Sequence, residues 1–509
     1  MFRKSKTVTG EAKAFADGKS FSVLNKSLKD NIIKFKELFR DDVTVIYHEF
    51  EVGESGVKCC IIFINGMVDN RVIDENIVKP VILAKLPEDK KNLIDVMSSS
   101  VIQCNDIEKS AETHKLVEKM LYGDTIFLLD GAKEGLAIST KGFKVRAIEE
   151  PTIERVFSGP REGFNENIMI NLSMIRRKLL TDKLKFKIRE FGDLAHTKAA
   201  VCYIDGVVNT ELLEEFERRL DAVKADGLLD SNHIYEMIKD QPYALFATLS
   251  KTERPDVIAA KLLEGKVALI VDGSPVALSA PFLFIDYFMN NDDYYQPFFI
   301  GSFARILRFI GFFISISVPA IYLSLVAFHQ ELLPTQLLYS ISMARHGVPF
   351  PSVFEILGLV LALELLIESG VRMSSNIGQA LSIVGAVVIG QSAVEAKLIS
   401  APLVIIVAIA GITGLLIPHM RTPISLLRFI LVCLSALMGL FGFLVGIAGI
   451  IIHLCSIYSF ELPYTLYSSP VNLSGIKDNL VRVSWLNMGA NRQLPIYEKE
   501  KKIKKGEGQ

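Results

Sequence analysis

The sequence predicts two unlike halves: an α/β N-terminal region of two related subdomains, and an all-α transmembrane domain of four to six membrane segments. One observation is a change in composition. Most Lys, Arg, Asp and Glu residues lie before about Gln296, whereas residues 309–458 are dominated by Leu, Ile, Val, Ala, Gly and Phe. The other observation is an internal repeat in the polar half. A chain of 509 residues also exceeds what one hydrophobic core normally holds, so two or three structural units are expected.

The repeat consists of two motifs that each occur twice. IFINGMVDNRVI at residues 62–73 resembles CYIDGVVNTELL at residues 202–213, and GDTIFLLDG at 123–131 resembles GKVALIVDG at 265–273. The first motif is typical of a strand, a glycine turn and the start of a helix, and the second of a strand closed by an Asp-Gly turn. The copies are 140 and 142 residues apart. We therefore expect related α/β subdomains at residues 40–148 and 180–296.

Charge, cysteine content and missing motifs argue against several classes of protein. The net charge of −1 argues against a nucleic-acid-binding protein, which normally carries a strongly basic face. The six cysteines form no CxxC pair and are expected to be buried thiols in a reducing compartment. Neither copy of the repeat contains a phosphate-binding glycine motif, and no Ser/His/Asp or Cys/His signature is recognisable. The sequence thus predicts no enzyme, no catalytic residue, no metal and no cofactor. The N-terminus lacks the apolar core of a signal peptide, so this half is expected to be cytoplasmic.

The segment between the subdomains, GPREGFNENIMINLSMIRRKL at residues 159–179, predicts a turn and a helix. Apolar residues recur at helical spacing from Ile168 to Leu179, and basic residues fill the last turn, near the negative end of the helix dipole. Two interpretations fit: a linker helix with a solvated basic end, or a docking element that contacts a neighbouring subunit. The docking candidates are the charged residues Arg161, Glu162, Arg176 and Arg177.

Five apolar segments are candidates for membrane crossings, at residues 309–328, 353–369, 377–396, 403–418 and 429–455. The first is long enough for one span at about 1.5 Å per residue. Arg305 and Arg308 precede it and are expected to reach cytoplasmic headgroups. The proline-broken residues 329–351 are expected to be interfacial or re-entrant. Both chain ends are expected in the cytoplasm, so the number of crossings must be even. Four are favoured, with 377–396 only partly inserted; a sixth segment at 329–351 is the alternative.

Polar residues within these segments are candidates for an ion path, because carboxylates at membrane depth normally face a protein interior or water. Glu364, Glu368 and Arg372 share one helix face, and Glu355 lies on the opposite face. A structural ladder with a Glu368–Arg372 ion pair and the wall of a polar conduit are both compatible with this spacing. The full set of candidates is Glu355, Glu364, Glu368, Arg372, Gln379, Gln391 and Glu395.

A series of motifs between residues 150 and 470 carries a family resemblance. In order they are GPREGF (159), NLSMIRRKL (171), YIDGVVN (203), TERPD (252), LLEGKVALIVDG (262), DDYY (292), RILRFI (305), HQELLP (329), VPFP (348), SIVGAVVIGQSAVEA (382) and HLCSIYSF (453). Together they resemble the A subunits of bacterial spore germinant receptors, the family named for GerA. The first 148 residues resemble the family only loosely.

The resemblance implies a function as well as a fold. It implies a multi-pass protein of the spore inner membrane with a cytoplasmic N-terminal region. Its partners would be a permease-like B subunit that binds nutrients and a lipoprotein C subunit. The A subunits would oligomerise into a ring that conducts ions, so that nutrient binding opens the conduit and starts germination. The polar residues of the membrane segments would then line or gate a cation path, and residues 159–179 would help subunits dock.

Departures from the family pattern leave other functions open. Ile367 stands where a basic residue is usual, Glu461 where a glycine is usual, and the tail after Trp485 lacks the usual Arg-Pro, which weakens any tail contact. The alternatives are a paralogous sporulation membrane protein acting in dipicolinic acid or ion release, and a non-conducting signalling scaffold. The expected domains are a tail (1–39), a subdomain (40–148), a linker and helix (149–179), a second subdomain (180–296), a transmembrane domain (297–470) and a cytoplasmic tail (471–509).

Overall fold

The computed structural model describes residues 23–85, 93–142, 159–372, 390–465 and 481–482. The chain divides into two compact units. The α/β unit comprises residues 1–155, 161–235 and 251–279, and the helical unit comprises residues 156–160, 236–250 and 280–509. Each unit has its own hydrophobic core.

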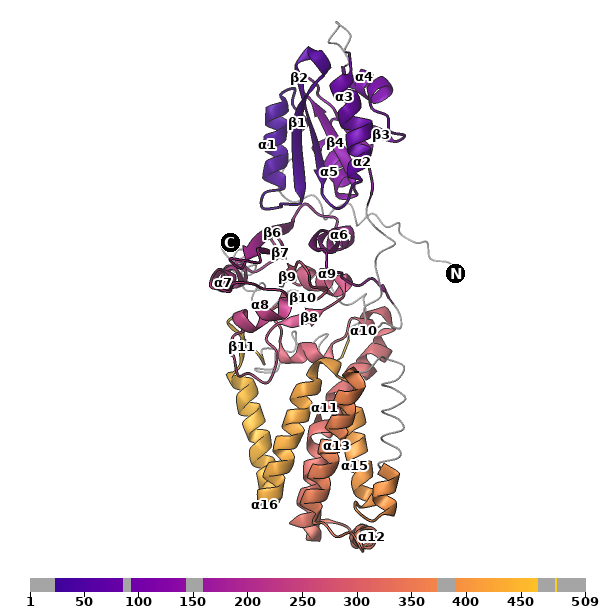
Figure 1. The fold of residues 1–509 in the computed structure, drawn as a ribbon, viewed down its shortest axis with the longest axis vertical. Coiled ribbons are helices and arrows are strands. Elements are labelled where there is room, and N and C mark those ends of the chain that lie inside the picture. The colour runs from indigo at the N-terminus through magenta and orange to yellow at the C-terminus, as the bar shows by residue number, and fades with distance from the viewer. Residues whose placement is uncertain (1–22, 86–92, 143–158, 373–389, 466–480, 483–509) are drawn as a thin grey trace, which may run out of the picture. The chain divides into compact units, whose positions relative to one another are not determined.

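The first subdomain of the α/β unit is an antiparallel sheet with strand order β1-β2-β4-β5-β3 (Figure 1). Its strands are β1 (Val45–Val52), β2 (Val57–Ile64), β3 (Ile107–Ser110), β4 (Asp124–Leu129) and β5 (Gly135–Ser139). Its helices are α1 (Leu28–Leu38), α2 (Asn70–Ile73), α3 (Lys79–Leu83), α4 (Leu93–Val96) and α5 (Thr113–Leu121). Because side chains alternate along a strand, Cys60 and Ile62 of β2 pack with α1 and α5, whereas Cys59 and Ile61 face the core that contains α3 and α4.

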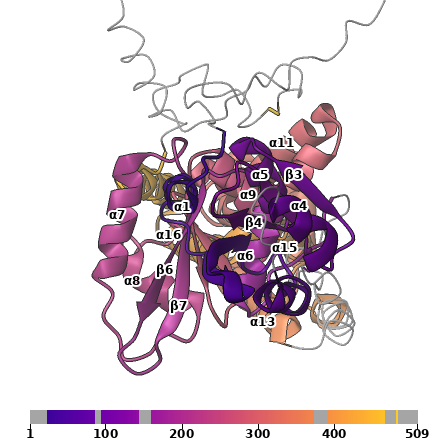
Figure 2. The same cartoon turned by 90° about the horizontal axis from the view of Figure 1, so that it is seen from above.

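The second subdomain repeats this topology, with strand order β6-β7-β9-β10-β8. Its strands are β6 (Leu184–Phe191), β7 (Thr197–Ile204), β8 (Ser250–Thr252), β9 (Val267–Val271) and β10 (Ala277–Ala280). Its helices are α6 (Ile168–Lys178), α7 (Thr210–Asp221), α8 (Ser231–Ile238) and α9 (Pro255–Leu263). Helices α6 and α9 share a core with β7 and β9, and α7 lies alongside β6 (Figure 2). The expected pair of related α/β subdomains is confirmed.

The repeat extends to individual hydrogen bonds. The Asp130 carboxylate accepts the backbone N–H of Leu28 at 3.0 Å, and Asp272 accepts that of Ile168 at 3.0 Å. Both acceptors belong to the repeated Asp-Gly turns, and both donors open the first helix of their subdomain. The turns therefore cap helices that have free N–H groups at this end.

Helix α6 is consequently the counterpart of α1. In both places an asparagine locks the loop before the helix: Asn31 binds the backbone of Asn25, and Asn171 binds that of Asn165. The expectation of a linker helix within residues 149–179 is wrong, because α6 is the first helix of the second subdomain. For the same reason α1 belongs to the first subdomain and not to a tail at residues 1–39.

The helical unit is built around long apolar helices. Its helices are α10 (Asp292–Tyr295), α11 (Phe298–Ala327), α12 (Thr335–Arg345), α13 (Ser352–Arg372), α15 (Ala401–Gly414) and α16 (Arg421–Ser456), followed by a short hairpin of β11 (Tyr458–Ser459) and β12 (Leu462–Pro463). Among the described residues, two segments are long and apolar enough to cross a membrane, Phe298–Ala327 and Pro418–Ser456. Residues of α11, α13, α15 and α16 share one core.

Helix α16 folds back on itself at Gly439. This residue has φ 61° and ψ −140°, the only non-helical backbone conformation within the described α16. Figure 1 shows α16 as two helical limbs that run in opposite directions. The two limbs touch each other, because a Cβ at Gly446 would meet the Leu431 side chain at 2.5 Å. The expectation of one long span at residues 429–455 is therefore wrong. At 1.5 Å per residue, limbs of 421–438 and 440–456 are each about 25–27 Å long.

We expect Gly439→Ala to destabilise this bend. A Cβ at Gly439 would lie 2.9 Å from Phe328 Cβ, and the backbone conformation is one that L-residues rarely adopt. Such strain costs about 1–3 kcal/mol. Thermal unfolding of the purified full chain in detergent should show a lower Tm. Gly449→Ala is the matched control, because a Cβ there has no neighbour within 4 Å. An equal Tm for both variants would contradict the bend.

Candidate functional site

A buried arginine connects four helices of the helical unit. The Arg428 side chain, on the first limb of α16, is 3 % exposed. Its Nε donates to the Ser315 carbonyl of α11 at 2.9 Å, and its Nη2 donates to the Ser315 hydroxyl at 2.7 Å and to the Ala410 carbonyl of α15 at 3.1 Å. Its Nη1 donates to Glu364 Oε1 of α13 at 3.2 Å. A charged side chain among apolar helices is costly unless paired, which makes this group a candidate functional site.

Glu364 therefore has its partner on another helix. Its side chain is 28 % exposed, and its Oε1 accepts the hydrogen bond from Arg428. Glu368, one turn further along α13, is exposed. Arg372 lies at the end of α13, but its side chain is outside the described residues. The Glu368–Arg372 ladder and the ion-path role of this face stay predictions.

Glu355 has a different environment. Its carboxylate is fully buried near the start of α13. Oε1 accepts a hydrogen bond from Arg345 Nη2 of α12 at 3.3 Å, and Oε2 accepts the backbone N–H of Ser400, the N-cap of α15, at 3.0 Å. Both oxygens thus hold three helical segments together. Glu355 therefore has a structural role in packing these segments together. A place for Glu355 in an ion path stays a prediction.

The remaining ion-path candidates lie in a segment that is described only in part. Gln379 is outside the described residues. Gln391 donates to Glu395 Oε1 at 2.8 Å, and both side chains are exposed. The structure does not bring this pair to Glu364 through any described contact.

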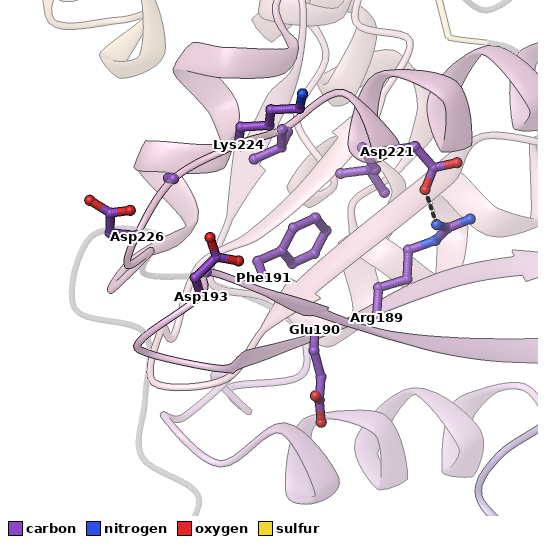
Figure 3. A pocket seen from close by; sticks show the side chains of 11 residues that line it. Arg189, Glu190, Phe191, Asp193, Asp221, Lys224 and Asp226 are labelled. Carbon is purple, nitrogen blue, oxygen red and sulfur yellow. Dashed lines mark hydrogen bonds and ion pairs between the residues drawn. The ribbon is translucent and has the colours of Figure 1, made fainter.

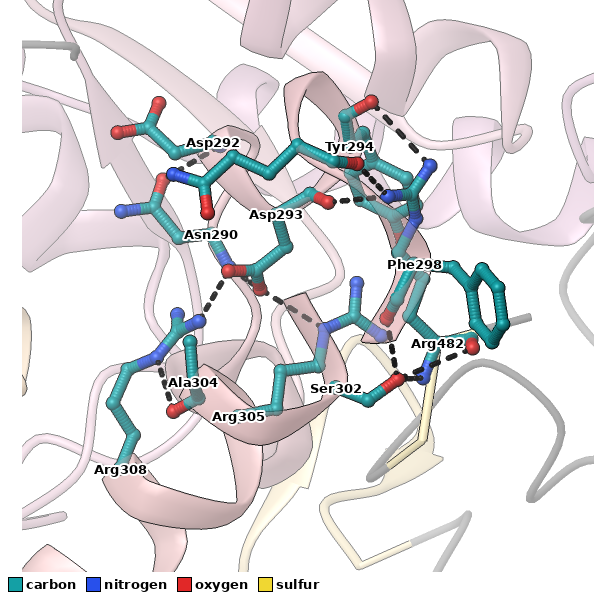
Figure 4. Close-up of polar contacts among 11 residues, drawn as sticks. Asn290, Asp292, Asp293, Tyr294, Phe298, Ser302, Ala304, Arg305, Arg308 and Arg482 are labelled. Carbon is teal, nitrogen blue, oxygen red and sulfur yellow. Dashed lines mark hydrogen bonds and ion pairs between the residues drawn. The ribbon is translucent and has the colours of Figure 1, made fainter. Parts of the chain in front are cut away.

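A second buried cluster forms where α10 meets α11 (Figure 4). Asp293 Oδ2 accepts a hydrogen bond from Arg305 Nε at 3.0 Å, and Asp293 Oδ1 pairs with Arg308 Nη2. The side chain of Arg305 is fully buried and that of Arg308 is 12 % exposed. The expectation that both arginines extend to lipid headgroups is wrong for Arg305, because Asp293 holds its guanidinium inside the protein.

The C-terminal tail reaches the same cluster through Arg482. Its Nη1 donates to the Asp293 carbonyl at 2.7 Å and to the Gln296 carbonyl at 2.5 Å, and its backbone N–H donates to the Ser302 hydroxyl at 3.0 Å. Arg482 is 2 % exposed. It holds residues 481–482 against α10 and α11, whereas the departure from the family pattern after Trp485 lies outside the described residues.

The predicted docking residue Arg176 is buried in an ion pair within this chain. Its Nη2 forms an ion pair with Asp42 Oδ2, and both side chains are at most 1 % exposed. The guanidinium also lies 4.7 Å from the Phe186 ring centroid. This pair joins the two subdomains, so Arg176 presents no surface to a neighbouring subunit, and the docking expectation is corrected for this residue.

Lys185 reinforces the same contact between subdomains. Its Nζ donates to the Leu38 carbonyl at the end of α1 at 2.8 Å. Burial lowers the pKa of this ammonium, while the Asp42 carboxylate acts in the opposite direction.

The other docking candidates are partly available. Glu162 pairs with Arg177 at 3.4 Å and with Lys178 at 2.8 Å, within the second subdomain. Their side chains remain 19–33 % exposed. Arg161 is exposed. Contact of Arg161, Glu162 and Arg177 with another subunit stays a prediction.

A hollow of about 640 Å³ lies in the second subdomain, beside the end of β6 and the chain after α7 (Figure 3). Its floor includes the buried Phe191 and Leu220. Its charged lining has both signs: Arg189, Glu190, Asp193, Asp221, Lys224 and Asp226. Arg189 and Asp221 pair with each other. The hollow contains no sequence-predicted site residue, and its mixed, exposed charges single out no ligand class.

Sequence reasoning missed Asp293, Arg428 and Arg482 as site residues. Arg428 could have been found, because it is a charge within a largely apolar run from Ile424 to Leu437. Asp293 lies in the DDYY motif, yet nothing in the sequence distinguishes it from Asp292. Arg482 stands in a polar tail, so no local pattern marks it as buried.

The fold and these buried charges define a class of protein: an α/β region of two subdomains followed by a bundle of apolar helices. Residues 33–494 match the family described as Bacillus/Clostridium GerA spore germination protein. The chain belongs to this family.

Several relatives are similar along almost the whole chain. Spore germination protein KA of Bacillus subtilis (strain 168) is 38 % identical over 491 residues, covering 96 % of this chain and 90 % of that protein. Spore germination protein GerLA of Bacillus cereus is 32 % identical over 465 residues, covering 90 % of this chain and 94 % of that protein. An uncharacterized membrane protein, YfkQ, of Bacillus subtilis (strain 168) is 34 % identical over 470 residues, covering 91 % and 90 %.

One solved structure is also similar to this chain. It is the N-terminal domain of the A subunit of the Bacillus megaterium spore germinant receptor GerK3, at 28 % identity and a TM-score of 0.43. The match covers 52 % of this chain and 99 % of that domain.

We expect Asp42→Ala to destabilise the α/β unit by about 3–5 kcal/mol, because it leaves the buried Arg176 guanidinium without a carboxylate. Hydrogen exchange of the full chain in detergent should show lost protection in α6 and β6. Asp182→Ala is the control, because Asp182 is a half-buried aspartate just before β6 whose described side-chain contact is a 3.5 Å hydrogen bond from Thr181. Equal protection in the two variants would contradict a role for the pair in joining the subdomains.

Proposed function

We propose that this protein is the A subunit of a nutrient germinant receptor in the spore inner membrane. In this proposal it oligomerises into a gated ion conduit whose opening triggers germination. The family membership and the KA and GerLA relatives, both named spore germination proteins, support the germination role. The ion pair between the buried Arg428 and the partly exposed Glu364, among apolar helices, is the observation that supports a conduit.

The proposed membrane part has four to six crossings, with both chain ends in the cytoplasm. Helix α11 and the 418–456 segment are each long and apolar enough to cross a membrane. The reversal at Gly439 gives α16 two limbs, so its end returns toward the side on which it starts. Two limbs contribute an even number of passes, which agrees with chain ends on one side.

In the proposed ion path, Glu364 is the central carboxylate. It combines partial exposure with a position in the helical core, whereas Glu355 has both oxygens engaged by Arg345 and Ser400. Glu368 lies one turn from Glu364 on the same face of α13 and extends the path. Gln391 and Glu395 are further candidates.

The proposed partners are a permease-like B subunit that binds the nutrient, a lipoprotein C subunit and further copies of this chain. Arg161, Glu162 and Arg177 are the proposed docking residues, because Arg161 is exposed and the other two are partly exposed at the start of the second subdomain. Arg176 takes no part, since the ion pair with Asp42 buries it.

Potassium flux from liposomes tests the conduit. The full chain is reconstituted with its B and C partners, intact and as Glu364→Gln/Glu368→Gln. We expect nutrient-dependent flux from the intact protein and a reduced or less cation-selective flux from the variant, because the path loses two carboxylates.

Glu331→Gln is the control, since this carboxylate lies outside α13 and is 70 % exposed. It should leave the flux unchanged. A stable oligomer without flux would overturn the conduit and favour a signalling scaffold instead.

A further inference from the structure

A proline leaves one carbonyl of α11 without its helical donor. In an α-helix the carbonyl of residue i accepts the N–H of residue i+4, and proline has no N–H. Pro319 lies inside α11, so the carbonyl of Ser315 has no donor at this position. A buried acceptor left without a donor costs about 1–3 kcal/mol.

Arg428 supplies the missing donor. Its Nε lies 2.9 Å from the Ser315 carbonyl oxygen, and Nη2 adds hydrogen bonds to the Ser315 hydroxyl and the Ala410 carbonyl. The Ser315 hydroxyl itself donates to the Ala410 carbonyl at 2.7 Å. The guanidinium is thus fixed by α11 and α15, through contacts that do not involve Glu364.

Glu364 is held less firmly than its partner. Its described contact with Arg428 is one hydrogen bond of 3.2 Å to Nη1, and its side chain is 28 % exposed against 3 % for Arg428. A rotation of the Glu364 side chain therefore breaks the ion pair without disturbing the bonds from Arg428 to Ser315 and Ala410. The pair consists of a fixed cation and a movable anion.

We infer that Arg428 is the positioning residue of the ion path: it holds and neutralises Glu364, and the charge balance of this pair sets whether cations or anions pass. Pro319 is part of the device, because it frees the carbonyl that fixes the guanidinium. The inference rests on the proposed conduit and adds to it the residue that controls charge selectivity.

The test is the potassium-to-chloride permeability ratio, measured from reversal potentials across bilayers that contain the full chain with its B and C partners. Arg428→Met leaves the negative charge of Glu364 unneutralised, so the permeability ratio should rise. We expect a rise of about tenfold, which corresponds to ~1.4 kcal/mol of additional attraction between the path and a cation. Glu364→Gln leaves Arg428 unneutralised and should lower the ratio. The double variant Arg428→Met/Glu364→Gln should return toward the wild-type ratio.

A merely structural role makes a different prediction. It would reduce the amount of folded protein in both single variants and leave the ratio unchanged or shifted in one direction. Arg428→Lys keeps the charge but offers fewer directed donors, so it should hold the ratio closer to wild type than Arg428→Met does. Opposite shifts in the two single variants support the inference, and equal or absent shifts overturn it.

The assignment of Pro319 has a separate readout that needs no flux. Pro319→Ala restores an N–H for the Ser315 carbonyl, so Arg428→Met should lower Tm less in the Pro319→Ala background than in the wild type. An equal loss in both backgrounds overturns this part of the inference. No flux from the wild-type assembly overturns the proposed conduit and, with it, the selectivity role. Wild-type flux with unchanged ratios in the variants overturns the selectivity role alone.

Discussion

A buried guanidinium is costly unless its N–H groups find acceptors, and three buried arginines of this protein lie beside carboxylates where its elements join. Arg176 and Asp42 meet between the subdomains, Arg305 and Asp293 meet where α10 turns into α11, and Arg428 and Glu364 meet among the apolar helices. Such a pair adds little net stability over a well-packed apolar contact, but removing one partner costs about 3–5 kcal/mol. A competing arrangement of the same elements would leave a buried charge alone and would be disfavoured by a cost of this size.

The two α/β subdomains share their topology and their helix caps, but they differ at one residue that forms the contact between them. Both copies have the same strand order, and an Asp-Gly turn caps the first helix of each. The copies differ at the position of Arg176, whose counterpart in α1 is the exposed Lys36. The planar guanidinium suits a buried ion pair better than an ammonium does. The contact between the subdomains thus depends on a residue that the repeat does not share.

The carboxylates of α13 separate into two physical kinds. Glu355 has both oxygens bound to neighbouring segments and resembles a cap, because it satisfies the backbone N–H at the N-cap of α15. Glu364 is partly exposed and has one described hydrogen bond, to a cation that other groups fix in place. Sequence position alone treats the two residues alike. Because of these different environments, Glu364 is a better candidate than Glu355 for a carboxylate that leaves its arginine partner in the proposed gating.

Several features of this protein follow from the sequence by itself. These are the boundary between polar and apolar halves, the repeat with its strands and turns, the apolar helices and the family. All depend on composition or on patterns within about ten residues, where the periods of strands and helices are visible. The tertiary structure alone decided that α6 opens the second subdomain, that α16 reverses at Gly439 and that Arg176 and Arg428 find Asp42 and Glu364. These partners lie 134 and 64 residues apart along the chain. No local period spans such distances, so only the packed chain determines which buried charge neutralises which.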